Sequence, residues 1–322
     1  MTTPGRRPGT IDTPHREPWR ERWVAAVLRF ALRRLLLPTF RADRPIPRQR
    51  RRLERIARLT LPPRGVRIEA GACGGVRGEW IHAAGAPKST AAILYLHGGA
   101  YCIGGPATHR AVAGTLARRT GATVFLADYR LAPEHPFPAA VHDAVAAYRG
   151  LLAQGLAPAQ VAIAGDSAGG GLALATAMQL RELGEALPAA LVAFSPWVDL
   201  GAPDRGPVPT GEVMVTPSWV AECARLYLAG CDPRTPLASP IHGELHGLPP
   251  TLVQVGTDEL LLSDSRRLHA ALTAASVRSQ LEEFPRRWHV FQANAGVLAD
   301  ADRALERAAH FLRERWDSRP ER

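Results

Sequence analysis

The sequence predicts an α/β fold: a mostly parallel sheet of eight strands with helices on both faces and a helical cap. Strand-like and helical patterns alternate along most of the chain, which is typical of parallel strands joined by crossover helices. An apolar fraction of 46% over 322 residues is also ample for the core of one large domain or two small ones.

Short apolar runs predict the strands. They fall at residues 65–70, 76–82, 91–96, 122–127, 160–164, 190–195, 251–255 and 279–284. The first two runs follow each other without a helix, so we expect them to pair antiparallel. Helical patterns separate most of the others, near residues 107–120, 138–154, 168–183, 263–275 and 299–315.

Two further segments predict the cap. Residues 1–18 are rich in Pro and Arg, and we expect disorder at the start. Apolar residues then recur at helical spacing from Trp19 to Leu37 with arginines opposite, and a shorter helix is expected at 48–59. The gap at 196–250 contains one more helix, Pro217 to Leu228. We therefore expect an N-terminal cap segment at 1–62, the main α/β unit at 63–195 and 237–322, and a second cap insertion at 196–236.

The positive charge lies in the N-terminal segment. The net charge is +10, yet residues 1–67 alone hold 18 Arg and 5 acidic residues. One interpretation is weak contact of the basic N-terminal helix with anionic surfaces. The interpretation that we favour is a solvated, arginine-rich helix face. No recognition module accompanies the arginines, so we expect no nucleic acid as a partner.

Cysteine usage and hydropathy bear on the compartment. The cysteines lack both paired metal spacing and a disulfide framework, so we expect free thiols in a reducing compartment. No apolar stretch approaches the ~18–20 residues of a membrane span. Arginines interrupt the apolar N-terminal stretch, which excludes a signal peptide. We expect a soluble cytoplasmic protein. The four cysteines are Cys73, Cys102, Cys223 and Cys231.

A Gly-x-Ser-x-Gly motif is centred on Ser167. A short apolar run precedes it and a helical pattern follows, as in the strand, sharp turn and helix of a nucleophile elbow. Gly165 and Gly169 lack a Cβ atom, so strand and helix can pack closely around the turn. We expect Ser167 to be a catalytic nucleophile, with its hydroxyl exposed above the sheet.

A serine nucleophile requires a base and an acid that orients the base. Asp258 follows the strand at 251–255 and is our choice for the acid; Glu259 is the near rival. Asp264 and Asp199 are less favoured, because the first belongs to the next helix and the second follows an earlier strand. His289 follows the last strand and is the expected base. The order serine, acid, histidine is that of the α/β-hydrolases.

Stabilising an oxyanion requires backbone N–H donors. We expect one from Ala168, directly after the nucleophile. Gly98 and Gly99 follow the strand at 91–96 and can turn their N–H groups towards the serine, because no side chain intrudes. We expect His97 to orient this loop and not to act as the base.

Three sequence blocks resemble the hormone-sensitive-lipase-like esterases, or bacterial lipolytic family IV, of the α/β-hydrolase fold. The resemblance covers roughly residues 93–291 and implies hydrolysis of short- to medium-chain carboxylic esters without metal or cofactor. It also implies supporting roles for Asp166 and Glu134, and a cap made from the two segments named above. The blocks are His-Gly-Gly-Ala at 97–100, Asp-Tyr-Arg-Leu-Ala-Pro-Glu-His-Pro-Phe-Pro-Ala at 128–139, and Gly-Asp-Ser-Ala-Gly-Gly at 165–170.

The sequence departs from the family pattern at two places. Ala100 stands where many members have Gly, and we expect little loss from it. Arg286 and Arg287 stand before the histidine where many members have a small pair, so we expect positive charge near the rim of the site.

Several alternatives remain. The motif around His242 and His246 lacks the order of a zinc site, so we expect no metal. A binding protein is disfavoured, because its family counterparts have lost the catalytic histidine. A lactone, amide or N-acetyl hydrolase, or transfer to an alcohol, would use the same triad and stays open. We expect a small-molecule ester as the partner, and a homodimer stays open.

Overall fold

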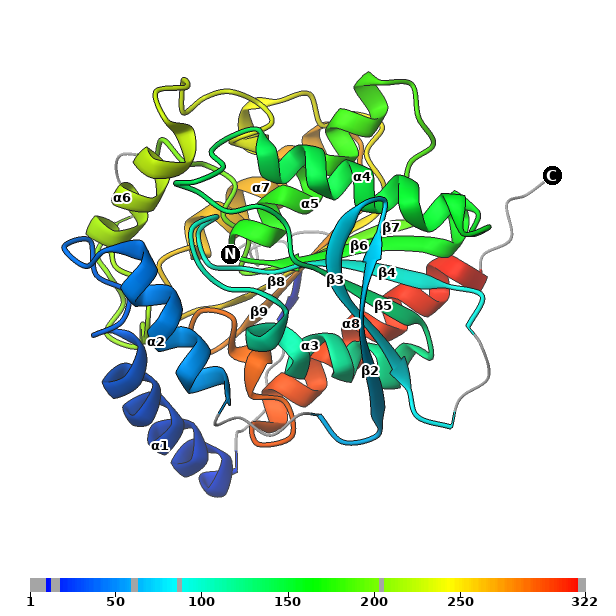
Figure 1. The fold of residues 1–322 in the computed structure, drawn as a ribbon. Coiled ribbons are helices and arrows are strands. Elements are labelled where there is room, and N and C mark those ends of the chain that lie inside the picture. The colour runs from blue at the N-terminus through cyan, green and yellow to red at the C-terminus, as the bar shows by residue number, and fades with distance from the viewer. Residues whose placement is uncertain (1–9, 13–17, 59–62, 86–88, 203–205, 318–322) are drawn as a thin grey trace, which may run out of the picture.

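A nine-stranded sheet forms the centre of the molecule (Figure 1). The computed structural model describes residues 10–12, 18–58, 63–85, 89–202 and 206–317. The strands lie side by side in the order β1-β9-β8-β7-β6-β4-β5-β3-β2. Their bounds are β1 (Thr10–Asp12), β2 (Val66–Cys73), β3 (Val76–Ala83), β4 (Ala92–Leu96), β5 (Thr123–Ala127), β6 (Val161–Asp166), β7 (Ala190–Phe194), β8 (Thr251–Gly256) and β9 (Ser279–Phe284).

The sheet is mostly parallel. Strand β3 runs antiparallel to both of its neighbours, β2 and β5. The other pairs are parallel. All eight expected strands are present, and the predicted α/β fold is confirmed.

Strand β1 corrects one expectation. We expected disorder at the start of the chain, yet residues 10–12 pair in parallel with Leu281, Glu282 and Glu283 of β9. The exposed edge of β9 would otherwise present unpaired backbone groups, and the backbone of a short extended segment can pair with them. Residues 1–9 and 13–17 lie outside the described residues.

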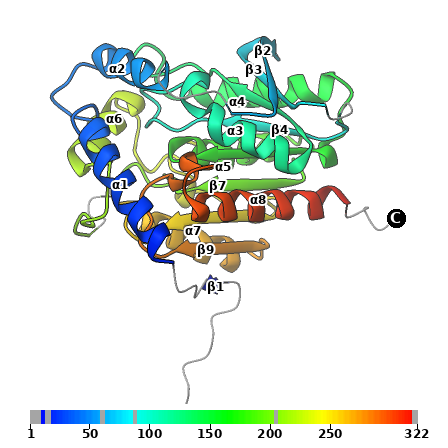
Figure 2. The same cartoon turned by 90° about the horizontal axis from the view of Figure 1, so that it is seen from below.

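Helices cover both faces of the sheet (Figure 2). Helices α3 and α8 contribute to the apolar cluster on one face, and α4, α5 and α7 to the cluster on the other. The helices are α1 (Trp19–Leu36), α2 (Ile46–Arg58), α3 (Pro106–Thr120), α4 (Ala139–Ala153), α5 (Ala168–Glu182), α6 (Pro217–Leu228), α7 (Leu262–Ala274) and α8 (Ala299–Asp317).

The central strands are apolar on both sides because helices cover both faces. In β4, Leu94 and Leu96 face one cluster while Ile93 and Tyr95 face the other. Strands β4, β6, β7 and β8 are buried along their whole length. This rigid centre fixes the loops that follow the carboxyl ends of the strands.

Helices α1, α2 and α6, which we call the cap helices, lie together at one end of the molecule (Figures 1 and 2). The ring of Phe40, between α1 and α2, stacks on Trp219 of α6 with 4.9 Å between centroids. The indole N–H of Trp219 donates to Gln49 Oε1 of α2 at 2.8 Å. The expected division of the chain into three units stays a prediction.

Helix α1 shows a second correction. Its apolar residues do not all lie on one buried face. Ala25 and Leu28 pack against the cluster around Trp288, whereas Trp23 is 65% exposed and Val27 46% exposed. Helical spacing alone could not separate the two sets. Within the described ranges, no helix combines the length and the hydropathy needed to cross a membrane.

Candidate active site

Ser167 occupies a strained turn between β6 and α5. Its φ and ψ are 53° and −120°, a conformation that costs a non-glycine residue free energy. A Cβ atom on Gly165 would lie 2.3 Å from Gly169 O, and one on Gly169 would lie 1.9 Å from Leu96 O. Glycine is therefore required at both positions, and the motif folds as the expected elbow.

Ser167 and His289 line one cavity of about 200 Å³ beneath the cap helices. Gly98 and Gly99 line it as well. No hydrogen bond joins the serine hydroxyl to the imidazole among the described residues, and such bonds often tighten only when substrate binds. The apolar wall of the cavity comes mainly from the cap segments: Leu36, Phe40, Leu53, Ile56, Ala57, Met214, Val215 and Trp219.

The carboxylate beside the histidine is Glu259. His289 Nδ1 lies 3.1 Å from Glu259 Oε1, and both side chains are buried. The expected contact between Asp258 and His289 is not formed, so the choice of Asp258 over Glu259 is wrong on geometry. The two residues are consecutive in a tight turn, and their side chains leave it in different directions.

Asp258 makes a different contact. Its carboxylate pairs with Arg29 of α1 at 3.1 Å, and both side chains are about a quarter exposed. The Arg29 guanidinium also donates to the carbonyl oxygen of Arg286 at 2.6 Å. Asp258 thus ties the first cap helix to the loops near the histidine.

Besides His289, two polar groups hold Glu259 in place. Its Oε2 accepts from Ser195 Oγ at 2.7 Å and from the backbone N–H of Gly256 at 2.9 Å. These donors fix the position of the carboxylate beside His289. Burial lowers the pKa of His289, but the hydrogen bond and charge of Glu259 outweigh burial, so the pKa lies above its usual value.

The expected oxyanion donors lie beside Ser167. Among the described residues, no acceptor engages the backbone N–H of Gly98, Gly99 or Ala168. Gly99 has φ +117°, and a Cβ atom there would lie 2.1 Å from Ile103 O. A Cβ atom on Gly98 would lie 2.2 Å from Asp166 Oδ2. Backbone geometry and space therefore both require glycine here.

His97 lies beneath this loop and is not among the residues that line the cavity. Its ring stacks on Tyr129 with 4.3 Å between centroids, and its Nδ1 donates to Gly98 O at 2.8 Å. Burial is the main cause that lowers the pKa of His97 to about 3, and the charge of the nearby His109 contributes as well. The imidazole is therefore neutral at ordinary pH and is suited to fixing the loop.

His109, which was not among the predicted site residues, also lines the cavity. Its Nε2 lies 3.3 Å from Asp166 Oδ2, and Tyr95 donates to Asp166 Oδ1 at 2.8 Å. Burial lowers the pKa of His109, but the Asp166 charge and hydrogen bond raise it above its usual value. The position of His109 in the first turn of the helix after the glycine loop was the only available signal.

Glu212 connects the cap insertion to the loop that carries Glu259. Its Oε1 accepts from the backbone N–H groups of Val213, Met214 and Val215 at 2.8, 3.0 and 3.2 Å. Its Oε2 accepts from the N–H of Leu260 at 3.0 Å. One buried carboxylate therefore fixes both segments.

The block at 128–139 and the two departures from the family pattern also have clear positions. Glu134 pairs with Arg50 of α2 at 2.8 Å, so the block is tied to the cap helices. Ala100 has φ 52°, where glycine is favoured. Neither Arg286 nor Arg287, from which we expected positive charge near the rim, is among the residues that line the cavity. Arg287 is buried and pairs with Asp300.

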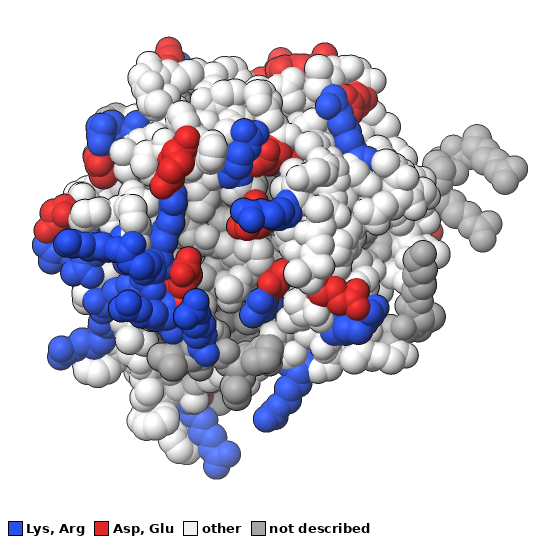
Figure 3. Space-filling model, viewed as in Figure 1, with Lys and Arg blue, Asp and Glu red and all other residues white. Residues whose placement is uncertain are grey.

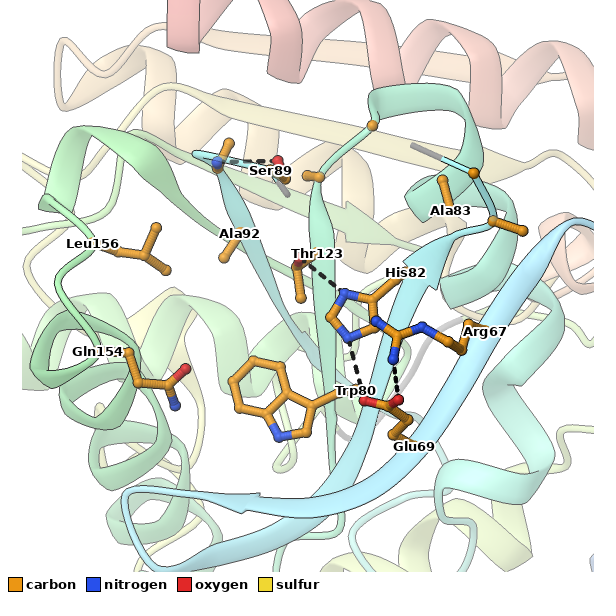
Figure 4. Close-up of a pocket in the computed structure, with 15 residues that line it drawn as sticks. Arg67, Glu69, Trp80, His82, Ala83, Ser89, Ala92, Thr123, Gln154 and Leu156 are labelled. Carbon is orange, nitrogen blue, oxygen red and sulfur yellow. Dashed lines mark hydrogen bonds and ion pairs between the residues drawn. The ribbon is translucent and has the colours of Figure 1, made fainter. Parts of the chain in front are cut away.

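Another cavity, of about 640 Å³, lies at the amino ends of β4 and β5 (Figure 4). Its polar groups contact one another: His82 Nδ1 lies 3.2 Å from Thr123 Oγ1, and Arg67 pairs with Glu69. Its one serine, Ser89, accepts from the backbone of Ala91. This cavity lacks a serine in a strained strand-to-helix turn like that of Ser167. Within the described residues, no group of three His, Cys, Asp or Glu could hold a metal ion.

A serine elbow, a histidine–carboxylate pair and free backbone donors at the carboxyl edge of this sheet define a serine hydrolase of the α/β type. The α/β hydrolase fold family matches residues 93–293. The chain belongs to this family and, within it, to the esterases similar to hormone-sensitive lipase. It is a carboxylic ester hydrolase.

Individual relatives agree with this assignment. The chain is 45% identical to an acetyl-hydrolase of Streptomyces hygroscopicus, over 81% of this chain and 86% of that protein. It is 36% identical to an esterase of Acinetobacter venetianus, over 80% of this chain and 86% of that protein. A solved esterase of the bacterial hormone-sensitive lipase family is 40% identical, with a TM-score of 0.85, covering 95% of this chain and 99% of that one.

Proposed function

We propose that the enzyme hydrolyses short-chain carboxylic esters through an acyl-enzyme on Ser167. The Ser167 Oγ attacks the ester carbonyl carbon while its proton passes to His289 Nε2. The imidazolium then protonates the leaving alcohol, and the acyl group stays on Ser167. Water, activated by the same imidazole, releases the acid and restores the serine.

Glu259 is the acid of this triad. The observation that carries the proposal is its contact with His289 Nδ1, at 3.1 Å. A carboxylate there keeps the proton on Nδ1, so that Nε2 can accept the proton from Ser167. It also stabilises the imidazolium that forms during attack. Asp258 has no part in this transfer, because it pairs with Arg29.

The backbone N–H groups of Gly98, Gly99 and Ala168 stabilise the oxyanion. Donors that are already in position cost no reorganisation as charge develops on the carbonyl oxygen. Each is worth about 10²–10³-fold in rate in comparable sites. Their N–H groups have no other acceptor among the described residues, which supports this role.

The cavity favours a short acyl group. Its volume is about 200 Å³, below the ~300–1,000 Å³ of sites that take drug-sized ligands. Phe40 and Trp219 form part of its wall and stack on each other. A long acyl chain would have to displace these rings.

Paired variants test the assignment of the acid. Glu259→Gln should lower kcat by about 10⁴-fold, as loss of the third triad member does elsewhere. Asp258→Asn removes the neighbouring carboxylate and should change kcat only a few-fold. Both are assayed with a small chromogenic ester, with thermal unfolding as a check on folding. Equal effects, or a larger effect of Asp258→Asn, would overturn the assignment.

A separate variant tests the nucleophile. Ser167→Ala should abolish ester hydrolysis and prevent labelling by a fluorophosphonate, while unfolding stays cooperative. Any more than trace turnover in this variant would exclude Ser167 as the nucleophile.

A second candidate function is removal of an acetyl group from nitrogen by the same residues. The similarity of the chain to an acetyl-hydrolase of Streptomyces hygroscopicus is compatible with this activity. The same triad and oxyanion donors serve either bond. A panel of acetyl esters, lactones and acetamides, compared by kcat/KM, distinguishes the candidates.

A further inference from the structure

The outward side of α1 carries a row of exposed apolar side chains. Trp19, Trp23 and Phe30 are 72%, 65% and 64% exposed. Spacings of four and seven residues put them on one side of the helix, with Val27 beside them. In the described part of the chain, α1 supplies five of the eight large apolar side chains that are exposed. The row is therefore a patch, which marks an interaction surface.

Arginines flank this row. The Arg20 guanidinium lies 5.6 Å from the centre of the Trp19 ring, and that of Arg34 lies 5.2 Å from the centre of the Phe30 ring. Aromatic rings with adjacent cations are typical of helices that lie in a membrane interface, with the rings in the headgroup region.

Helix α2 continues the basic surface. Arg48, Arg51, Arg52 and Arg55 follow one another at helical spacing and line a shallow hollow on the outside of the protein. None of them lies within ion-pairing distance of a described carboxylate, whereas Arg50 on the inner side pairs with Glu134. Basic side chains gather over this part of the molecule (Figure 3).

We propose that the outer surface of α1 and α2 docks the enzyme on an anionic lipid bilayer. The apolar row supplies insertion into the headgroup region, and the unpaired arginines supply attraction to anionic lipids. The charge is local, because residues 1–67 hold 18 Arg against 5 acidic residues while the whole chain has a net charge of +10. The protein would therefore approach the bilayer in one orientation.

Other occupants fit this surface less well. A second copy related by a two-fold axis would bring each patch against itself and place arginines opposite arginines. A nucleic acid would match the arginines but not the exposed Trp19, Trp23 and Phe30, whose row is continuous and apolar. An anionic bilayer complements both features.

The same helices form a wall of the cavity that contains Ser167. Leu36 of α1 and Leu53 and Ile56 of α2 line that cavity from the inner side. Docking by the outer side would therefore bring the lipid phase, where apolar esters concentrate, next to the cap helices.

Vesicle flotation of the full chain tests the proposal. The probes are vesicles of phosphatidylcholine alone and of equal parts phosphatidylcholine and phosphatidylglycerol. We expect binding to the anionic vesicles only, and loss of binding at high salt. Trp23→Ser with Phe30→Ser should lower the partition coefficient about tenfold or more. Arg51→Gln with Arg55→Gln should lower it by about fivefold per arginine.

Matched controls change similar side chains elsewhere. Leu183 and Val297 are 52% and 61% exposed and lie outside the cap helices, so Leu183→Ser with Val297→Ser should leave vesicle binding unchanged. Arg278→Gln is the control for charge. Hydrolysis of a water-soluble ester should be unchanged in all variants, which confirms folding.

Three results would overturn the proposal. The first is a wild-type protein that does not bind anionic vesicles. The second is binding that both cap-helix variants retain. The third is a wild-type dimer in sedimentation that Trp23→Ser with Phe30→Ser dissociates, without vesicle binding. That last result would assign the patch to a second copy of the chain.

Discussion

The Ser195 hydroxyl joins the two loops that carry the acid and the base. Ser195 directly follows β7 and has φ 48°. Its Oγ donates to Glu259 Oε2 at 2.7 Å and accepts from the backbone N–H of Val290 at 3.2 Å. Val290 follows His289 directly, so one hydroxyl positions both members of the pair. Replacing Ser195 with Ala removes both contacts and adds no bulk.

The hydrogen bonds set the size of the effect. A hydrogen bond to a charged group contributes about 1.5–3 kcal/mol. If the Ser195 contact fixes the Glu259 carboxylate for catalysis, its loss should lower kcat by about 10- to 150-fold. KM should change little, because Ser195 does not line the cavity. A buried N–H without an acceptor should also cost about 1–3 kcal/mol of stability.

A second substitution separates the hydroxyl from the backbone. Ser195→Gly removes the same hydroxyl but relieves the positive φ. Both variants are assayed by kcat and KM on a soluble ester and by denaturant unfolding. We expect the same fall in kcat in both, and a smaller loss of stability in the glycine variant. Wild-type kcat in either variant would refute a positioning role for the hydroxyl.

Three further predictions concern pH and substrate size. Because Glu259 raises the pKa of His289 and the base must be neutral, kcat/KM should fall as pH drops through a value above about 6.5; Glu259→Gln should move this limb to lower pH. Burial raises the pKa of Asp166, but the charge and hydrogen bond of His109 outweigh burial, so this pKa lies below its usual value. Asp166→Asn should therefore lower the free energy of unfolding by about 3 kcal/mol above about pH 4. The loss should be smaller below the lowered pKa of Asp166 and above the raised pKa of His109, because the wild-type protein then lacks the ion pair as well. Phe40→Ala should raise the ratio of kcat/KM for long over short acyl esters, at a stability cost of about 3–5 kcal/mol; an unchanged ratio would show that this ring does not limit chain length.

The elbow could be predicted because its causes are local. The strand, the two glycines and the helix all lie within a few residues of Ser167, and the close approach of Gly165 to Gly169 O leaves no room for another side chain. The same holds for Gly99 after β4, which approaches Ile103 O four residues further along. Steric constraints between residues close in sequence therefore made the turn around Ser167 predictable.

The identity of the acid could not be predicted because its causes are distant. Ser195 is 64 residues from Glu259 along the chain, and Arg29 is 229 residues from Asp258. These contacts decide which of two consecutive carboxylates turns towards His289. A sequence pattern contains no information on partners at such separations.

The buried side of α1 could not be predicted for a related reason. Apolar residues occur on opposite sides of this helix, and only the position of the Trp288 cluster decides which side is buried. The strand β1 was missed because three residues in a Pro- and Arg-rich segment show no periodicity. Its pairing depends on the free edge of β9.

The contacts of Glu212 have a mechanical consequence. Movement of the 213–215 segment away from the sheet would strip Leu260 of its hydrogen-bond acceptor and loosen the turn beside Glu259. While residues 213–215 were displaced, the Glu259 carboxylate would be held less firmly. Substitutions in this buried segment should therefore slow turnover, although they do not touch the reacting atoms.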